Sequence, residues 1–209
     1  LVLAPSSVQE MASLTATAFD LADIYRMPAM LLADGALGQM MEPVDFSAFE
    51  KHEIPEKPWA TVGHQNNREH NIVNSLFIDP QVLEDSVRER YKRYDIVEDK
   101  EVRYEAFCTD DADILLVAFG ITARICKSAV TAARDMGIRA GLLRPITLWP
   151  FPKKPIAAAA DHVKALLSVE MSMGQMVDDV RLAVNGKKPV YFYGRTGGMI
   201  PSVEEVTEE

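Results

Sequence analysis

Residues 101–209 alternate short apolar runs with helical patterns, and this alternation restricts the fold more than any other feature of the chain. The run at residues 114–119 (ILLVAF) is apolar throughout, which is typical of a strand covered on both faces of a sheet. Residues 122–136 follow with helical spacing that turns Cys126, Val130 and Met136 inward. Gly137 then stands where a left-handed helix cap is expected. We therefore expect an α/β fold, a mostly parallel sheet with helices on both faces.

The other patterned segments extend this arrangement. We expect strands at residues 102–108 (a sheet edge), 138–143, 165–169 and 189–193, helices at 155–163 and 174–184, and an acidic tail that frays after one helical turn near 204–209. Earlier in the chain, residues 1–5 and 28–33 are expected to be strands. Between them, a helix should begin at a capping box of Ser7 and Glu10 and end near Arg26, since Pro28 disfavours helical geometry at the residue before it.

This first strand–helix–strand unit predicts two parallel strands with a right-handed crossover. Such a pair leaves an apolar face and both edges open, so we expect it to require further sheet or a partner chain. Leu1 is not an initiator methionine and already belongs to a strand pattern. We therefore expect the chain to begin inside a fold, as a fragment of a longer protein.

Between the two patterned parts, residues 42–68 contain Pro43, Pro55 and Pro58 among mixed charges, which predicts a linker that wraps over a surface. A charged helix follows at 80–94 and should be exposed along much of its length. Its pairs Glu84/Arg88 and Glu89/Arg93 would contribute about 0.2–0.5 kcal/mol each. The resulting division is residues 1–50, a linker with a charged helix at 51–100, and a second domain at 101–209.

Composition excludes several functions. Residues 1–100 contain 17 Asp or Glu against 9 Lys or Arg, which argues against a nucleic-acid surface. No apolar run approaches the ~20 residues of a membrane span, so we expect no membrane contact. The two cysteines, Cys108 and Cys126, are expected to be buried and are too few to hold an iron–sulfur cluster. His64 and His70 have no companion ligands in the pattern, so we assign no metal site.

The carboxyl ends of parallel strands form the functional edge of such a sheet. Four loops are expected there: residues 34–41, 120–124, 144–152 and 170–175. Glycines in these loops allow close backbone approach, and the helices that follow could offer free amides to an anion. Glycine after a strand is more often simple turn punctuation, and we favour that interpretation for Gly120.

Two charged residues stand out at this edge. Arg144 could bind a phosphate or carboxylate, or it could pair with Glu170 across the edge, and we favour the ion pair. Glu170 ends an apolar strand and needs a partner, which could be Arg144, Arg195 or an amide of a neighbouring subunit. No His, Lys or Ser is spaced to make Glu170 a catalytic acid.

Three motifs then point to a family: residues 142–152 (LLRPITLWPFP), 169–181 (VEMSMGQMVDDVR) and 194–201 (GRTGGMIP). Together with the opening APSSVQEM and the segment ADGALGQMMEP, they closely resemble the alpha subunit of 2-oxoacid:ferredoxin oxidoreductases. The first part is similar to the end of the family's thiamine-pyrimidine domain, and residues 101–209 to its transketolase C-terminal-like domain. Residues 74–77 (NSLF) and the RPITLWPFP run resemble the branched-chain, 2-oxoisovalerate-type members.

The resemblance implies a cytoplasmic multi-subunit enzyme that oxidatively decarboxylates a 2-oxo acid to acyl-CoA. Thiamine diphosphate with Mg would lie at a subunit interface and be bound largely by a partner, and the iron–sulfur clusters would belong to partner subunits only. The implied partners are beta (thiamine diphosphate-binding), gamma and ferredoxin-like subunits, with ferredoxin, CoA and the 2-oxo acid. The family's glutamate that activates the aminopyrimidine has no counterpart here, so we assign no catalytic residue and expect this chain alone to be inactive.

The same resemblance suggests two groups of site residues. Those expected near the cofactor are Asp34, Gly35, Gly38 and Gln39; those expected at the sheet edge or an interface are Arg144, Glu170, Gly174 and Gln175. Two alternatives remain open. The chain could be a non-catalytic interaction module with a transketolase C-terminal-like fold. A transketolase or branched-chain dehydrogenase beta chain shares the fold but matches the GRTGG and WPFP motifs less well.

Overall fold

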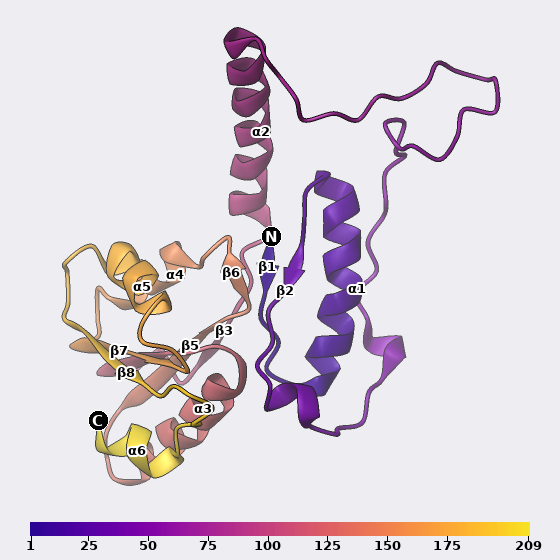
Figure 1. The fold of residues 1–209 in the computed structure, drawn as a ribbon. Helices are drawn as coiled ribbons and strands as arrows, with labels where there is room; N and C mark the ends of the chain where they lie inside the picture. The colour runs from indigo at the N-terminus through magenta and orange to yellow at the C-terminus, as the bar shows by residue number, and fades with distance from the viewer.

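A parallel strand–helix–strand unit forms the first part of the computed structural model, which describes residues 1–209 (Figure 1). β1 (Val2–Leu3) and β2 (Met30–Leu31) are parallel, and α1 (Val8–Tyr25) connects them. As predicted, Ser7 caps α1 by accepting the Glu10 N–H and the helix ends at Arg26, which adopts the left-handed region. The capping box is only half formed, because the Glu10 carboxylate accepts from the Ser6 N–H and not from Ser7. The Glu10 carboxylate has a second partner, described below.

The first sheet is completed by a strand from the second half of the chain. β6 (Thr147–Trp149) pairs antiparallel with β1, which gives the order β2-β1-β6. The expected need for further sheet is thereby met at the β1 edge of the parallel pair. Leu3, Leu21 and Val97 form the core beneath this sheet, and Trp149 packs against it. The two halves of the chain thus share one sheet.

The second sheet has five strands and confirms the predicted mostly parallel α/β architecture. Its strands are β3 (Tyr104–Phe107), β4 (Ile114–Val117), β5 (Ala140–Pro145), β7 (Ala165–Glu170) and β8 (Val190–Gly194). Their order is β3-β5-β4-β7-β8, and only the edge strand β3 is antiparallel to its neighbour. The central position of β4 explains why residues 114–117 are apolar on both faces.

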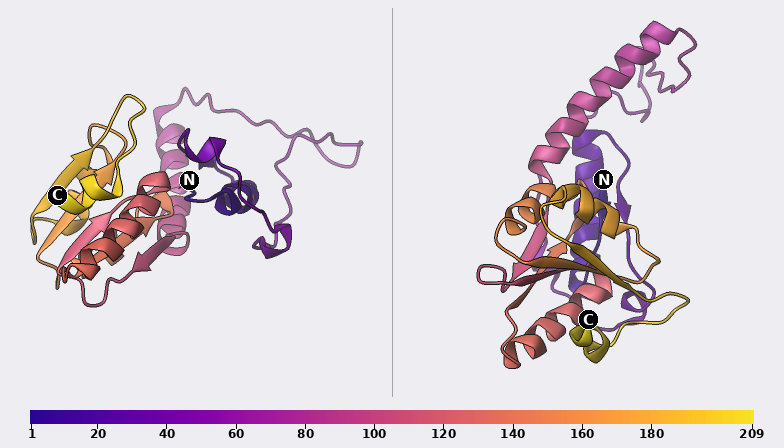
Figure 2. Two further views of the ribbon diagram at one scale, coloured as in Figure 1. Left: turned by 90° about the horizontal axis from the view of Figure 1, so that it is seen from below. Right: turned by 90° about the vertical axis from the view of Figure 1, so that its left-hand side faces the viewer.

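Helices cover both faces of this sheet (Figure 2). The elements are α3 (Gly120–Asp135) and α6 (Val203–Glu208) on one face, and α4 (Lys153–Ala159) and α5 (Met176–Val184) on the other. Side chains alternate along β4, so that Leu115 and Val117 pack toward α4 and α5 while Leu116 packs toward α3. Each face therefore buries its own apolar core.

Two details of these helices differ from expectation. Met136 follows the last residue of α3 and is exposed rather than inward, because the helix ends at Asp135 and Gly137 turns the chain at φ 84°. The tail does not fray after one turn. Ser202 and Glu205 form a complete capping box, and Val206 is buried against the sheet, so α6 is anchored.

α2 (Pro80–Lys100) stands apart from both sheets in Figure 1 and is six residues longer than predicted. Only Val97 is buried in it, which confirms a largely exposed helix. The pair Glu84/Arg88 forms, whereas Glu89 pairs with Lys92 because Arg93 turns back toward the Arg26 carbonyl. Although α2 is long, it is too polar to cross a membrane, and no other helix is long and apolar enough to do so.

Residues 42–79, which lead to α2, contain only a short 3₁₀ turn, η2 (Phe46–Ala48), and lie partly along α1. His52 Nδ1 is 3.1 Å from an Asp20 carboxylate oxygen, and Lys57 Nζ is 2.7 Å from one of Asp23. Farther on, the rings of His64 and His70 lie 4.0 Å apart. Nowhere in the chain do three or more His, Cys, Asp or Glu side chains gather in a way that could hold a metal ion.

The two cysteines differ in exposure, which corrects the expectation that both are buried. Cys126 lies within the core on α3, whereas Cys108 is exposed just after the edge strand β3, at φ 53°. Burial raises the pKa of the Cys126 thiol to about 12, so almost none of it is thiolate at pH 8. We predict that a thiol reagent such as DTNB modifies one cysteine per native chain rapidly and the second only after denaturation. As a control, the Cys108→Ser variant should contain no rapidly reacting thiol in the native state.

Candidate functional site

The four loops predicted at the sheet edge meet around a cavity of about 320 Å³ between the two sheets. Asp34 comes from the end of β2 and Gly120 from the end of β4. Leu148 and Phe151 come from the 144–152 loop, and Glu170 ends β7. Apolar walls and several carboxylates thus surround one space, which is the arrangement typical of a small-molecule pocket.

Glu170 is the most completely bonded side chain in this cavity wall. It is 3% exposed, and its Oε2 accepts from the Gln175 and Met176 amides at 3.0 Å each and from the Ser172 hydroxyl at 2.9 Å. Its Oε1 accepts from the Val177 amide at 2.8 Å and from the Ser168 hydroxyl at 3.0 Å. Glu170 therefore caps α5 from within the same chain.

This network explains the other two edge residues. Gly174 adopts φ 101° in the turn between β7 and α5, and Gln175 occupies the N-cap position of that helix. A Cβ on Gly174 would lie 3.1 Å from Val177 Cγ1, so the turn favours glycine for both conformation and space. The hydroxyls of Ser168 and Ser172 were missed by the sequence reasoning. Their spacing of two residues on either side of Glu170 is the signal that could have placed all three on one face.

The predicted ion pair between Arg144 and Glu170 is wrong. β4 separates β5 from β7, so the two residues lie two strands apart. Arg144 also has the same parity as Leu142, which packs toward α3, whereas Glu170 has that of Leu166, which packs toward α4 and α5. Because side chains alternate across a strand, the two charges lie on opposite faces of the sheet.

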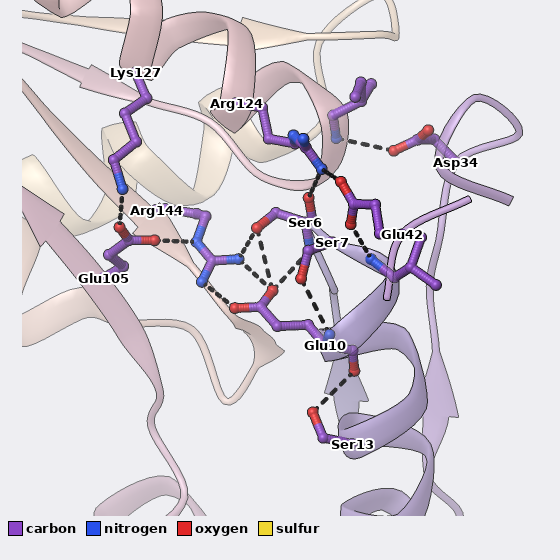
Figure 3. Close-up of polar contacts among 12 residues, drawn as sticks. Ser6, Ser7, Glu10, Ser13, Asp34, Glu42, Glu105, Arg124, Lys127 and Arg144 are labelled. Atoms are coloured by element: carbon purple, nitrogen blue, oxygen red, sulfur yellow. Dashed lines mark hydrogen bonds and ion pairs between the residues drawn. The ribbon is translucent and has the colours of Figure 1, made fainter. Parts of the chain in front are cut away.

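Arg144 instead joins the two halves of the chain (Figure 3). It is 4% exposed, and its two terminal nitrogens each donate to a different Glu10 oxygen at 2.7 Å, while Nη1 also donates to the Ser6 hydroxyl. Its Nε lies 2.9 Å from Glu105 Oε2 but is not aimed for a hydrogen bond, so that contact is electrostatic. The guanidinium thus links α1 to the edge of the second sheet.

The Glu10 carboxylate makes this contact sensitive to acid. Burial pushes its pKa upward, but the hydrogen bonds and charge of Arg144 outweigh burial and hold the pKa below its usual 4.5. A depressed carboxyl pKa contributes stability above the unfolded pKa, and this is lost as pH falls through the lower folded value. We predict that Glu10→Gln reduces the loss of unfolding free energy between pH 5 and pH 2.5, measured by denaturant titrations. An unchanged pH dependence would contradict this role.

Asp34 binds two backbone amides of its own chain. Its Oδ1 accepts from Leu37 at 2.8 Å, and its Oδ2 accepts from Ile121, in the first turn of α3, at 2.9 Å. A Cβ on Gly120 would lie 2.9 Å from that Oδ2, so glycine leaves space for the carboxylate. Gly120 also has φ 62°, so its backbone conformation favours glycine, as the turn interpretation predicts, and the space beside Asp34 adds to that preference.

The remaining residues of this loop are open. Gly35 and Gly38 have no heavy atom within 4 Å of the position where a Cβ would stand, and Gln39 is exposed at the end of the turn η1 (Leu37–Gln39). Of the four residues predicted near the cofactor, Asp34 has its carboxylate bonded to two backbone amides of this chain. The side of the chain at Gly35, Gly38 and Gln39 is open.

The cavity is acidic. Asp34, Glu170 and Asp179 all line it. Burial raises the pKa of the Asp179 carboxyl, and the nearby charges of Asp178 and Glu170 add to this against an opposing effect of Lys153. Glu170 occupies the first amides of α5, and Asp34 accepts the Ile121 amide at the start of α3, so a carboxylate already stands at the start of both helices.

The chain consists of two α/β units, and the cavity lies at the carboxyl ends of their parallel strands. The family model "Pyruvate flavodoxin/ferredoxin oxidoreductase, thiamine diP-bdg" matches residues 1–106, and "Pyruvate:ferredoxin oxidoreductase core domain II" matches residues 112–206. The chain belongs to the pyruvate flavodoxin/ferredoxin oxidoreductase family. The alpha-subunit resemblance seen in the sequence is thereby confirmed.

The similar curated proteins are subunits of 2-oxoacid oxidoreductases. Ketoisovalerate oxidoreductase subunit VorB of Methanothermobacter thermautotrophicus is 46% identical over 100% of this chain and 59% of its own length. The protein of that name from Methanothermobacter marburgensis is 45% identical over 99% of this chain and 58% of its own. 2-Oxoglutarate synthase subunit KorA of M. marburgensis is 31% identical over 99% of this chain and 62% of its own. The chain thus spans about three-fifths of these relatives.

Among solved structures, the fold is similar to 2-oxoglutarate:ferredoxin oxidoreductase from Magnetococcus marinus, with a TM-score of 0.75 and 19% identity. The match covers 99% of this chain and 41% of that one. The likeness supports the order and packing of the elements and confirms the predicted fold class.

The residues present do not fit the diphosphate end of thiamine diphosphate. A diphosphate with its metal requires free donors and oxygen ligands. Here Glu170 occupies the amides at the start of α5, Asp34 accepts the Ile121 amide of α3, and no group of three or more His, Cys, Asp or Glu side chains could hold a metal ion. What this chain offers toward such a cofactor is the open backbone at Gly35 and Gly38.

Proposed function

We propose that this chain is part of a subunit of a thiamine diphosphate-dependent 2-oxoacid:ferredoxin oxidoreductase that acts on a branched-chain 2-oxo acid. The reaction would convert the 2-oxo acid and CoA to acyl-CoA and CO₂, and two electrons would pass to ferredoxin. The full-chain identity of 46% to a ketoisovalerate oxidoreductase subunit, against 31% to a 2-oxoglutarate synthase subunit, carries the substrate assignment.

We further propose how the work is divided. The first part, residues 1–50, would supply the Asp34–Gln39 loop at the cofactor side, with the linker at 51–100 and an assembly domain at 101–209. Beta, gamma and ferredoxin-like subunits would hold the Mg–diphosphate end and the iron–sulfur clusters, in a cytoplasmic complex. The acidic cavity and the internally bonded Asp34 and Glu170 support this division, because they place negative charge where a diphosphate would otherwise approach the helix starts.

The alternative of a module without ligand contact is favoured for the second sheet alone. Arg144 points into the contact between the two halves of the chain, and Glu170 is fully bonded to α5. Neither residue is free to bind a substrate. The second sheet would then act through assembly and positioning.

The test is a reconstituted complex of the complete subunit with its partner subunits. CoA-dependent reduction of ferredoxin should show its highest kcat/KM with 2-oxoisovalerate, and lower values with 2-oxoglutarate and pyruvate. Residues 1–209 alone should show no turnover with any of them. Failure of the complex with every branched-chain and aryl 2-oxo acid would overturn the proposed function.

A further inference from the structure

The loop between Asp34 and Glu42 is held at both ends by the first turn of α3. At its start, Asp34 Oδ2 accepts the Ile121 N–H at 2.9 Å. At its end, Glu42 Oε1 accepts from Arg124 Nη1 at 2.7 Å. Residues 121 and 124 lie three apart, so they share one helical turn. We refer to these two contacts as the loop clamp (Figure 3).

The end of the clamp at Glu42 is tied to α1 as well. Glu42 Oε2 accepts the Val8 N–H at 2.9 Å, and Arg124 Nη1 also donates to the Ser6 carbonyl at 3.3 Å. Three elements from distant parts of the sequence therefore meet at the Glu42–Arg124 pair. α3 packs against the second sheet, whereas α1 and the loop are part of the unit that contains the first sheet.

Between its two ends the loop is open. Leu37 is buried and holds the middle down, but Gly35 and Gly38 have no neighbour where a Cβ would stand, and Met41 is 97% exposed. The amides of residues 37–40 donate within the loop, so what its fixed base can hold out at a defined place is the Gly35 backbone and the Gly38 carbonyl. This is what a site that approaches a ligand through its backbone requires.

The pair contributes little to stability by itself. Arg124 has 39% of its side chain exposed, and water screens exposed ion pairs so that they contribute little to folding stability. Arg124 also cannot be a free anion site, because Glu42 neutralises it at 2.7 Å. A contact that is weak for folding but joins three elements at the base of one loop is suited to positioning.

We propose that Arg124 and Glu42 are positioning residues that hold the Gly35–Met41 segment in place against the cofactor of the assembled enzyme. This inference rests on the proposed function for its activity readout, but not for its structural one. It assigns to α3 the task of transmitting the placement of the second sheet to the cofactor-side loop.

The experiment uses the complete subunit in complex with its partners and compares Arg124→Gln, Glu42→Gln and Arg124→Lys. Amide hydrogen exchange should speed up in residues 35–41 in both glutamine variants, with Tm unchanged. The thiamine diphosphate concentration for half-maximal activity should rise about tenfold, since small misplacements around a reacting group have large effects. Arg124→Lys keeps the charge and should restore most of that loss.

Arg139→Gln is the matched control. Arg139 makes an exposed ion pair with Asp113 at 3.0 Å, far from the loop in the fold, and its loss should change neither exchange in residues 35–41 nor the cofactor requirement. Unchanged loop exchange in both glutamine variants would overturn the clamp. Faster exchange with an unchanged cofactor requirement would overturn the positioning role. A wild-type complex without 2-oxo acid oxidation would overturn the proposed function, while the exchange result still decides the clamp.

Discussion

Glu170→Gln is expected to lower the free energy of unfolding by about 3 kcal/mol, because it leaves buried donors facing each other. Each carboxylate oxygen accepts at least one backbone N–H, from Met176 on one side and Val177 on the other. A glutamine NH₂ group would therefore meet an N–H in either orientation. The measurement is equilibrium denaturation of the two proteins, combined with hydrogen exchange in α5, where protection should fall first.

Asp178→Asn provides the matched control on the same helix. Asp178 lies in the first turn of α5 and pairs with Arg181, but it is exposed. Its replacement should cost less than about 1 kcal/mol, the scale of an exposed charge near a helix start. If Glu170→Gln proved as stable as Asp178→Asn, the network at the start of α5 would not be what holds that helix.

Arg144→Met should also destabilise the chain strongly, by about 3–4 kcal/mol, the cost of removing one partner of a buried pair. The methionine fills the space of the stem, so the loss isolates the guanidinium. Glu10 and Glu105 would then face each other without the cation that separates them. Arg144→Lys should recover only part of the loss, because a single ammonium cannot bind both Glu10 oxygens as the planar fork does.

A double-variant cycle tests whether Glu10 is the partner that matters. Arg144→Met combined with Glu10→Gln should be less destabilised than the sum of the single changes, by more than about 1 kcal/mol. Arg139→Met, which removes an exposed ion pair, should stay within about 1 kcal/mol of wild type. Additive effects of Arg144 and Glu10 would show that the contact between the two halves does not depend on this pair.

Most of the second sheet could be predicted because its signals are local. The apolar run at β4, the left-handed Gly137 and the alternation of strands and helices all act within a few residues of each other. The sequence predicts an end of α2 at Tyr94, six residues early. No helix-breaking residue stands between Tyr94 and Glu101, and Val97 continues the apolar face three residues after Tyr94. These two signals together would have extended the helix.

The contacts between the halves could not be predicted, because they join residues far apart in sequence. Arg144 and Glu10 are 134 positions apart, and Arg124 and Glu42 are 82 apart. The sequence predicts correctly that Arg144 lies at the end of a strand. The alternation of side chains along that strand also places Arg144 on the same face as Leu142, and this would have excluded Glu170 as its ion-pair partner. β6 is three residues long and pairs with a strand at the other end of the chain, so no local pattern marks it.

The pairing of β6 with β1 has a consequence for how this protein can change over time. The relative placement of the two sheets is set by strand pairing and by side chains such as Arg144, not by the part of the connection at residues 58–79, which follows the ion pairs of Glu42, Glu50, His52 and Lys57. The length and path of that segment therefore do not determine how the two sheets are placed. Insertions, deletions and substitutions in that segment should leave the cavity in place. It is therefore the part of the surface where related proteins can evolve contacts with a new binding partner without changing the cavity.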